Sequence, residues 1–303
     1  MNYRHAYHAG NFADVLKHAV LVLVIEYLKR KEAPFRVIDT HAGRGRYALD
    51  AAEATKTGEW QGGIGRFLGP DVPPLPAAIA GLMSPYLDAV RAENDNRGLR
   101  LYPGSPLIAR RLMRAQDTLV VNELHPEERA HLRAALRQGR RVKVMALDGW
   151  IALRSLLPPK ERRGVVLIDP PFEAEGELGR LAQGLAQGLR RFQTGVCIAW
   201  YPIKDPKAIA GFHGALAALG KRELLGVELM LRRPVAPERL NGCGLVVANP
   251  PHTLAEELAR LLPELARRMG EGSAAHRIEP IAAKARGGGR VSPMPQRERG
   301  SIL

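Results

Sequence analysis

Asp169, Pro170, Pro171 and Phe172 follow the apolar run Val165–Ile168, and their types and order suit chemistry on a flat, amine-bearing ring. Proline fixes φ and lacks an N–H, so a strand that ends here leads into a stiff turn. The Asp169 carboxylate or the Pro170 carbonyl can accept a hydrogen from an exocyclic amine, and Phe172 offers a stacking face. For this tetrapeptide alone, an ordinary strand exit with a capping Asp is the alternative.

Four predicted strands end on or just before an acidic residue. The strands are predicted from short apolar runs, and they cover Phe35–Asp39, Thr118–Asn122, Val142–Ala146, Val165–Asp169, Gly195–Tyr201, Leu224–Leu231 and Gly244–Ala248. The acids are Asp39, Glu123, Asp148 and Asp169. Because ligands bind at the carboxyl ends of strands in open α/β sheets, we expect these four side chains to converge on one crevice.

The strands alternate with helical patterns, which predicts an α/β protein with a doubly wound, seven-stranded, Rossmann-like and mainly parallel sheet. Asp39 and Glu123 lie much farther apart than the roughly 30 residues of a simple βαβ unit, so a small helical subdomain is predicted as an insertion over residues 51–101. Residues 1–50 would form an N-terminal segment and the first β-α unit, and residues 102–270 the rest of the domain. Residues 271–303 are basic and poor in apolar side chains, and we expect a disordered tail.

Composition indicates a globular protein with an anionic partner. The 303 residues are 46% apolar, which is enough for one substantial core, and the net charge of +14 favours nucleic acid first and an anionic membrane surface second. The longest apolar stretch, Ala19–Ile25, is far shorter than the roughly 20 residues of a membrane span, and no leader pattern precedes it. We therefore expect a cytoplasmic protein. Cys197 and Cys243 are interpreted as buried apolar side chains.

The loop after the first predicted strand contains Gly43 and Gly45, and a helix is predicted to follow it. Glycines allow close approach of a ligand to the backbone, although a G-x-G turn alone is a weak signal. Glu123 is suited to gripping two ribose hydroxyls, with a solvated loop acid as the alternative. Asp148-Gly149 can accept from an adenine amine, but the pair is also common in turns. The ordered set of strand-end motifs is more specific than any one of them.

This order of motifs resembles that of S-adenosylmethionine-dependent amino-methyltransferases. Up to about residue 270, the chain resembles the bacterial 23S ribosomal RNA (adenine-N6)-methyltransferases of the J type. The resemblance is carried by Tyr3-Arg4-His5, His8–Asn11, Ala13–His18, Asp39–Gly43, Tyr102–Arg110, Glu123–Pro126, Asp148-Gly149 and Leu167–Pro171. Two positions depart from the family pattern: Phe172 stands where Tyr is usual, and Arg44 where a small residue is usual.

The resemblance implies transfer of a methyl group from S-adenosylmethionine to the N6 amine of a specific adenine in 23S rRNA. It places catalysis at Asp169 and a substrate contact at Tyr3. The residues that it implies for the methyl donor are His18, His41, Ser105, Glu123, Asp148, Gly149 and Asp169.

The N-terminal segment Met1–His18 is predicted to contact RNA. Tyr3, Arg4 and Lys17 combine an aromatic face with two cations, a pairing suited to a flipped base and its phosphates, and Phe172 is a further stacking candidate. The segment is therefore expected to fold over the filled crevice as a lid. The alternative is a core role for Tyr3 and a solvated surface position for Lys17.

Two other patterns are given structural interpretations. His5, His8 and His18 have no cysteine nearby, so we expect no metal site. Asn249-Pro250-Pro251-His252 resembles a second amino-methyltransferase motif, but it follows the last strand and precedes a predicted capping box at Thr253.

Three alternative functions remain at this stage. A DNA adenine-N6 methyltransferase would use the same chemistry, and a non-catalytic RNA-binding protein could keep the same fold. An NAD-dependent enzyme is a weaker alternative, because no strand-end acid lies about 20 residues after the glycines. We expect a monomer with no membrane contact.

Overall fold

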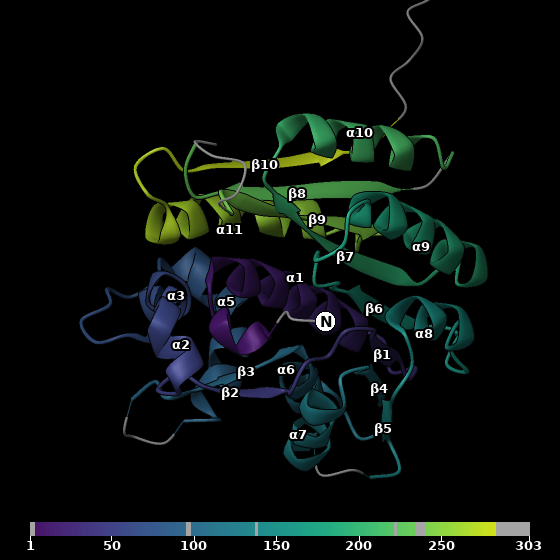
Figure 1. Ribbon diagram of the computed structural model, residues 1–303, viewed down its shortest axis with the longest axis horizontal. Helices are drawn as coiled ribbons and strands as arrows, with labels where there is room; N and C mark the ends of the chain where they lie inside the picture. Colours follow the sequence, from purple (N-terminus) through teal and green to yellow (C-terminus); the bar gives the residue numbers. More distant parts are fainter. Residues whose placement is uncertain (1–3, 95–97, 137–138, 221–222, 234–239, 283–303) are drawn as a thin grey trace, which may run out of the picture.

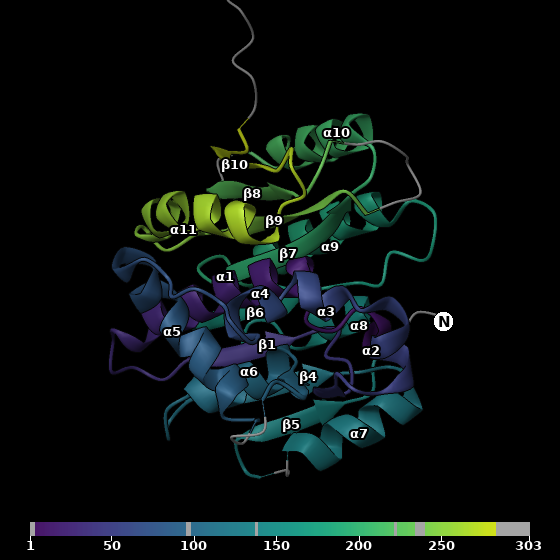
Figure 2. The same cartoon turned by 90° about the vertical axis from the view of Figure 1, so that its left-hand side faces the viewer.

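The structure is a computed structural model, and it describes residues 4–94, 98–136, 139–220, 223–233 and 240–282. A central eight-stranded sheet extends across the molecule from β10 at one edge to β5 at the other (Figures 1 and 2). In spatial order its strands are β10 (Ala275–Pro280), β8 (Leu224–Met230), β9 (Gly242–Ala248), β7 (Val196–Ile203), β6 (Gly164–Ile168), β1 (Arg36–Asp39), β4 (Thr118–Asn122) and β5 (Val142–Met145).

The strand order reverses at β1. From β1 the chain adds β4 and β5 on one side, then returns to place β6 and β7 on the other, and all these neighbours pair in parallel. Strand β9 runs antiparallel between β7 and β8. The predicted doubly wound sheet is confirmed, and such a reversal opens a crevice at the carboxyl ends of the strands.

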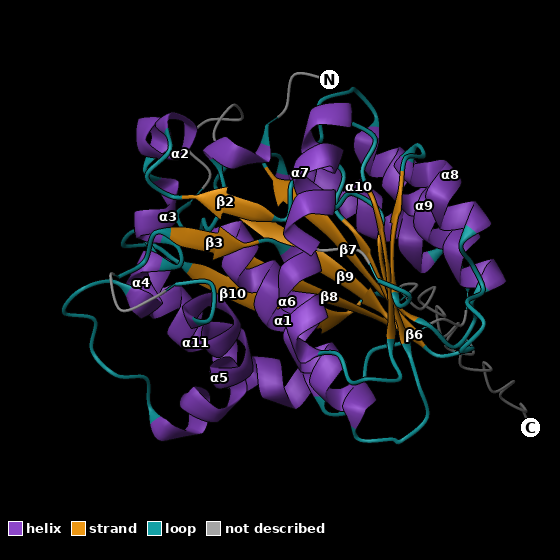
Figure 3. Ribbon diagram, turned by 90° about the horizontal axis from the view of Figure 1, so that it is seen from below, coloured by secondary structure: helices purple, strands orange, loops and turns teal. Residues whose placement is uncertain are grey.

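Helices cover both faces of the sheet (Figure 3). Their buried side chains and those of the strands form two apolar clusters. One face carries α1 (Phe12–Lys29), α5 (Ala77–Arg91), α6 (Ser105–Leu112), α7 (Pro126–Leu136) and α11 (Leu254–Met269). The other carries α8 (Gly149–Ser155), α9 (Glu177–Arg191) and α10 (Pro206–Ala217).

Helix α1 is buried along most of its length, because it lies between the sheet and α5, α6 and α11. The short 3₁₀ helix His5–Tyr7 precedes it. The Asn11 side chain begins α1 by accepting hydrogen bonds from the N–H groups of Ala13 and Asp14, both at 3.0 Å. This burial places the polar side chains of the first turns of α1 inside the protein.

The predicted insertion is helical, and it separates β1 from α6. The inserted segment is longer than the predicted 51–101, because it begins with β2 (Arg46–Ala48) and ends with β3 (Leu101–Pro103). Between these strands lie α2 (Ala52–Thr57), α3 (Glu59–Gly62), α4 (Gly65–Leu68) and α5. Strands β2 and β3 pair with each other, and the Gly104 N–H donates to the Gly45 carbonyl at 2.7 Å. The glycine loop therefore leads first into β2 and then into α2, whereas α6 begins only after the insertion.

The prediction of a disordered tail is wrong for its first part. Strand β10 pairs antiparallel with β8 and adds the eighth strand. The side chains of β10 are mostly exposed, although Ile278 packs against the core, so backbone hydrogen bonds to the edge of β8 are its main attachment. Composition does not reveal such pairing. The rest of the predicted tail, 283–303, lies outside the described residues.

Candidate active site

A cavity of about 700 Å³ lies at the carboxyl ends of β1, β4 and β6. Glu123, Asp148 and Asp169 line it, and Asp39 is buried nearby, where it accepts a hydrogen bond from Ser105, another lining residue. Three of the four strand-end acids thus meet in one cavity as predicted, whereas Asp39 is buried next to it and does not line it. The cavity also brings together the other predicted site residues that line it: Lys17, His18, His41, Gly149 and Phe172.

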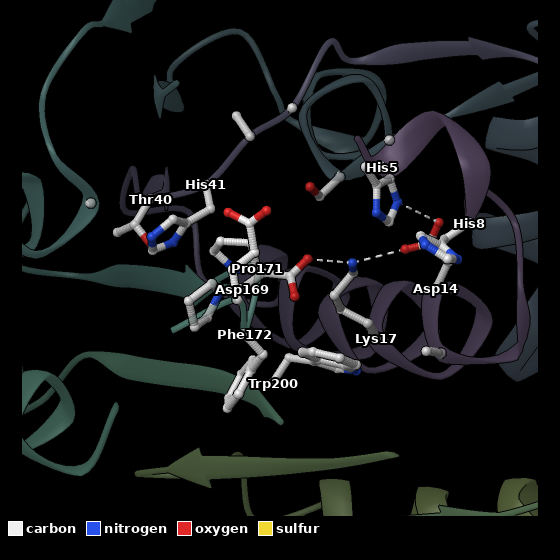
Figure 4. A pocket seen from close by; sticks show the side chains of 18 of the residues that line it. His5, His8, Asp14, Lys17, Thr40, His41, Asp169, Pro171, Phe172 and Trp200 are labelled. Atoms are coloured by element: carbon white, nitrogen blue, oxygen red, sulfur yellow. Dashed lines mark hydrogen bonds and ion pairs between the residues drawn. The ribbon is translucent and has the colours of Figure 1, made fainter. Parts of the chain in front are cut away.

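Asp169 is held by a buried lysine from α1 (Figure 4). Lys17 Nζ donates to Asp169 Oδ2 at 2.5 Å and lies 2.8 Å from Asp14 Oδ1. Lys17 is only 4% exposed. Burial disfavours its charged form, but the two carboxylates raise the pKa of Lys17 well above its usual value. The sequence predicts an RNA contact for Lys17, whereas the structure places its ammonium between two acids.

The lysine belongs to a longer polar network that reaches the N-terminal segment. Asp14 Oδ2 lies 2.9 Å from His5 Nε2 and accepts from the Gly10 N–H at 2.8 Å. The contacts to His5 and Lys17 hold the pKa of Asp14 well below its usual range despite complete burial. Asp14 therefore connects the N-terminal turn to the residues that hold Asp169.

Two aromatic rings stand beside Asp169. Phe172, with a φ of 52°, packs edge-on against Trp200 of β7, at a centroid distance of 5.6 Å and an angle of 76°. Both rings line the cavity (Figure 4). Trp200 is not predictable as a site residue, because an aromatic inside an apolar strand has no distinguishing pattern. Together the rings and the Asp-Pro-Pro turn form a wall suited to a flat base.

Glu123 is fixed by two backbone donors. Its Oε2 accepts from the Gly43 N–H and its Oε1 from the His125 N–H, both at 2.8 Å. Burial raises the pKa of Glu123, and these two donors oppose the increase. A carboxylate has about four acceptor sites, so each oxygen can accept a further hydrogen from a ligand.

His41 packs so closely on Gly149 that no side chain fits there. A Cβ at Gly149 would lie 2.2 Å from His41 Nε2. The Thr40 hydroxyl lies 2.9 Å from His41 Nδ1, and burial lowers the pKa of His41 to about 4. Asp148 begins α8, since its Oδ1 accepts from the N–H groups of Trp150 and Ile151 at 2.9 and 3.2 Å.

Hydrogen bonds hold together the loops that carry these residues. Ser105 Oγ donates to Asp39 Oδ2 at 2.6 Å, and the His41 N–H donates to Asp39 Oδ1 at 3.1 Å. Burial raises the pKa of Asp39 to about 6. Asn122, which has no distinguishing pattern in the sequence, donates to the carbonyl groups of Thr40 and Leu147, in the loops after β1 and β5, at 3.0 and 2.8 Å. Asn122 also lines the cavity, and its hydrogen bonds hold the two loops in place there.

Of the other N-terminal predictions, Tyr3 lies outside the described residues. The Arg4 side chain is about half exposed and lies 3.7 Å from Glu127.

Arg44, the unusual residue in the glycine loop, makes an ion pair with Glu128 through two hydrogen bonds, at 2.9 and 2.6 Å. This pair fixes the loop to α7.

The second Pro-Pro motif lies outside the lining of the cavity. Because β9 is antiparallel to β7, Asn249 lies at the sheet edge opposite to Asp169. Its side chain donates to the carbonyl groups of Gln193 and Gly195, both at 2.8 Å. The predicted capping box is wrong, since the Thr253 side chain makes no cap hydrogen bond at the start of α11.

Cys197 and Cys243 are buried and free, as predicted. Within the described ranges, no group of three or more His, Cys, Asp or Glu side chains is placed to hold a metal ion. No helix in the described part of the chain is long and apolar enough to cross a membrane.

Comparison with known proteins assigns the family. The family model described as "Ribosomal RNA large subunit methyltransferase D, RlmJ" matches residues 32–281. The chain belongs to this family. Two relatives carry the name "Ribosomal RNA large subunit methyltransferase J". The one from Escherichia coli (strain K12) is 41% identical over 276 residues, which is 91% of this chain and 96% of the relative.

The relative from Haemophilus influenzae is 40% identical over 281 residues, which is 92% of this chain and 98% of that protein. A crystal structure of protein LPL1258 from Legionella pneumophila superposes with a TM-score of 0.81 at 34% identity, and it covers 90% of this chain and 98% of that one. These matches confirm the family that the sequence motifs predict. The chain is thus a methyltransferase that uses S-adenosylmethionine as its methyl donor.

Proposed function

We propose that this protein methylates the N6 amine of a specific adenine in 23S rRNA, with Asp169 as the catalytic residue. The observation that carries the proposal is the position of Asp169. It lies in a stiff turn beside Phe172 and Trp200, and it shares one cavity with Glu123. A carboxylate next to a stacking wall suits an amine on a flat base, and Glu123 suits a ribose.

S-adenosylmethionine supplies an electrophilic methyl group when it is bound. The donor fits the cavity chemically, because both Glu123 oxygens are aligned by backbone donors and retain acceptor sites for adjacent hydroxyl groups. Asp148 has Oδ1 engaged at the start of α8, which leaves Oδ2 to accept from the donor's adenine amine. By family resemblance, His18, His41 and Ser105 complete the donor site, and Gly149 leaves room for His41.

On the acceptor side, Asp169 binds the adenine amine. The N6 lone pair is conjugated with the ring, so the amine must be held in line with the methyl group for transfer. Lys17 fixes Asp169 Oδ2, which leaves Oδ1 to accept a hydrogen from the amine. The carboxylate then stabilises the positive charge that develops on the nitrogen and takes its proton. Phe172 stacks on the base.

A paired adenine cannot enter such a cavity, so the target must be single-stranded or flipped out. The names of both relatives favour ribosomal RNA over DNA. A non-catalytic RNA-binding protein would not need Asp169 fixed by a buried lysine in the donor cavity. An rRNA substrate agrees with the net charge of +14 and with a cytoplasmic location. The monomeric state stays a prediction.

Asp169→Asn tests the proposal, since it keeps the side chain's shape and removes its charge. Methyl transfer to 23S rRNA should fall by about 10²–10³, as for other lost preorganised groups, while donor affinity measured by calorimetry changes little. Asn249→Ala at the other Pro-Pro motif is the matched control and should leave turnover nearly unchanged. An Asp169→Asn variant that keeps more than about a tenth of wild-type turnover would remove Asp169 from the catalytic role.

A further inference from the structure

Three buried rings from three elements form a hydrogen-bonded chain next to the cavity. His18 Nδ1 lies 2.7 Å from the Tyr102 hydroxyl, which in turn lies 2.9 Å from the Tyr86 hydroxyl. His18 belongs to α1, Tyr102 to β3 and Tyr86 to α5. The imidazole is stacked on the Tyr102 ring at a centroid distance of 5.7 Å and an angle of 26°. The insertion thus supplies the groups that contact a residue of the donor cavity.

All three side chains are shielded from water. Tyr86 and Tyr102 are fully buried and His18 is 1% exposed. Burial lowers the pKa of His18 to about 3 and raises the pKa of both tyrosine hydroxyls. The imidazole and the two phenols are therefore neutral at physiological pH, and each has a single hydrogen to donate.

The number of available hydrogens determines which group donates in each of these two hydrogen bonds. If His18 donated from Nδ1 to Tyr102, then Tyr102 would donate to Tyr86, and the Tyr86 hydrogen would have no acceptor among the described residues. A buried donor without a partner is destabilising. In the reverse direction Tyr86 donates to Tyr102 and Tyr102 donates to Nδ1, so each hydroxyl hydrogen has an acceptor. This order puts the imidazole hydrogen on Nε2.

We propose that Tyr102, supported by Tyr86, is a positioning residue that fixes His18 in the Nε2–H tautomer, so that His18 donates a hydrogen bond to the carboxylate of the methyl donor's amino-acid portion. This inference rests on the proposed donor site. His18 lines the cavity, and no described residue forms a hydrogen bond with its Nε2. An N–H group is complementary to a carboxylate and not to an ammonium, so the tautomer determines which end of the amino-acid portion His18 binds.

Tyr102→Phe tests the inference in the full-length protein, because it keeps the stacked ring and removes the hydroxyl. Calorimetry with S-adenosylhomocysteine, which carries the carboxylate, should show about three- to tenfold weaker binding. Methylthioadenosine has the same ribose and adenine but no amino-acid portion, and its affinity should not change. A general loss of structure would weaken both ligands.

The tautomer can be observed directly by nitrogen NMR of labelled histidine. In the wild type, His18 Nδ1 should appear unprotonated and Nε2 protonated, and Tyr102→Phe should give a mixture of tautomers. Tyr86→Phe should have a smaller effect in the same direction. Tyr201→Phe is the matched control, because Tyr201 is also buried, with its hydroxyl 2.9 Å from His213 Nε2, and it does not line the cavity.

The outcomes separate the inference from the proposed function. If His18→Ala leaves S-adenosylhomocysteine affinity unchanged, then His18 is not in the donor site and the assignment of that site is wrong. If His18→Ala weakens binding but Tyr102→Phe preserves both the affinity and the single tautomer, the positioning role is overturned.

Discussion

At the scale of single residues, Glu123 connects the glycine loop after β1 to the start of α7. Its carboxylate is fixed by the N–H groups of Gly43 and His125 before any ligand arrives. Little side-chain freedom is then lost when the ribose of the donor binds. Preorganisation of this kind improves affinity without adding contacts.

Glu123→Ala should weaken binding of S-adenosylhomocysteine by at least about tenfold, because each hydrogen bond to a charged group contributes roughly 1.5–3 kcal/mol. Glu127→Ala is the control, since Glu127 is a nearby acid that is about half exposed. Calorimetry that gives equal affinities for the wild type and Glu123→Ala would exclude a ribose contact.

The residue types at the strand ends were predictable, because acids after apolar runs stand out in the sequence. Lys17 was not, since its partner Asp169 is 152 positions away and a lysine on a helix is normally solvated. Trp200 was missed for a similar reason. Its position beside Phe172 depends on the pairing of β6 with β7, which the local sequence does not reveal.

At the scale of elements, the negative charge of the buried Asp39 carboxylate, between β1 and α6, destabilises the folded protein. Burial raises the pKa of Asp39 from 3.8 to about 6, and the hydrogen bond from Ser105 opposes this only in part. Because the folded pKa lies above the unfolded one, the stability contributed by Asp39 is fully present below pH 3.8. It is lost as the pH rises through about 6.

Asp39→Asn should therefore flatten the pH dependence of unfolding. Between pH 4 and pH 7, the wild type should lose on the order of 2–3 kcal/mol of unfolding free energy relative to the variant. Urea unfolding of both proteins across this range measures the difference. If the unfolding free energies of the two proteins changed equally with pH, burial would not raise the pKa of Asp39.

The elements themselves were predictable where apolar periodicity is strong, and all seven predicted strands are present. Strands β2, β3 and β10 could not be predicted. Strands β2 and β3 have three residues each, which is too short for an alternating pattern, so the interrupted β1–α6 connection was hidden. Strand β10 has a polar sequence and is held by its edge position.

At the scale of the whole molecule, the basic end of the chain should tune RNA affinity. Residues 283–303 contain five basic residues and one acid. Removing them should weaken rRNA binding and reduce its salt dependence without changing the target adenine or the melting temperature. Removal from residue 271 onward also deletes β10 and exposes the edge of β8, so this longer truncation should lower the melting temperature.

Filter binding at several salt concentrations and thermal unfolding measure these effects. Methylation of a different adenine by the shorter truncation would mean that the tail selects the target. Equal melting temperatures for the two truncations would mean that β10 contributes nothing to stability.

The central claim is that one cavity transfers a methyl group to an adenine N6 in 23S rRNA. Transfer of labelled methyl from S-adenosylmethionine to unmodified 23S rRNA, followed by mapping of the product, tests it most directly. We predict one labelled N6-methyladenine per 23S rRNA molecule and no labelling of duplex DNA under the same conditions. Label on DNA, on a base other than adenine, or on any adenine atom except N6 would contradict the account.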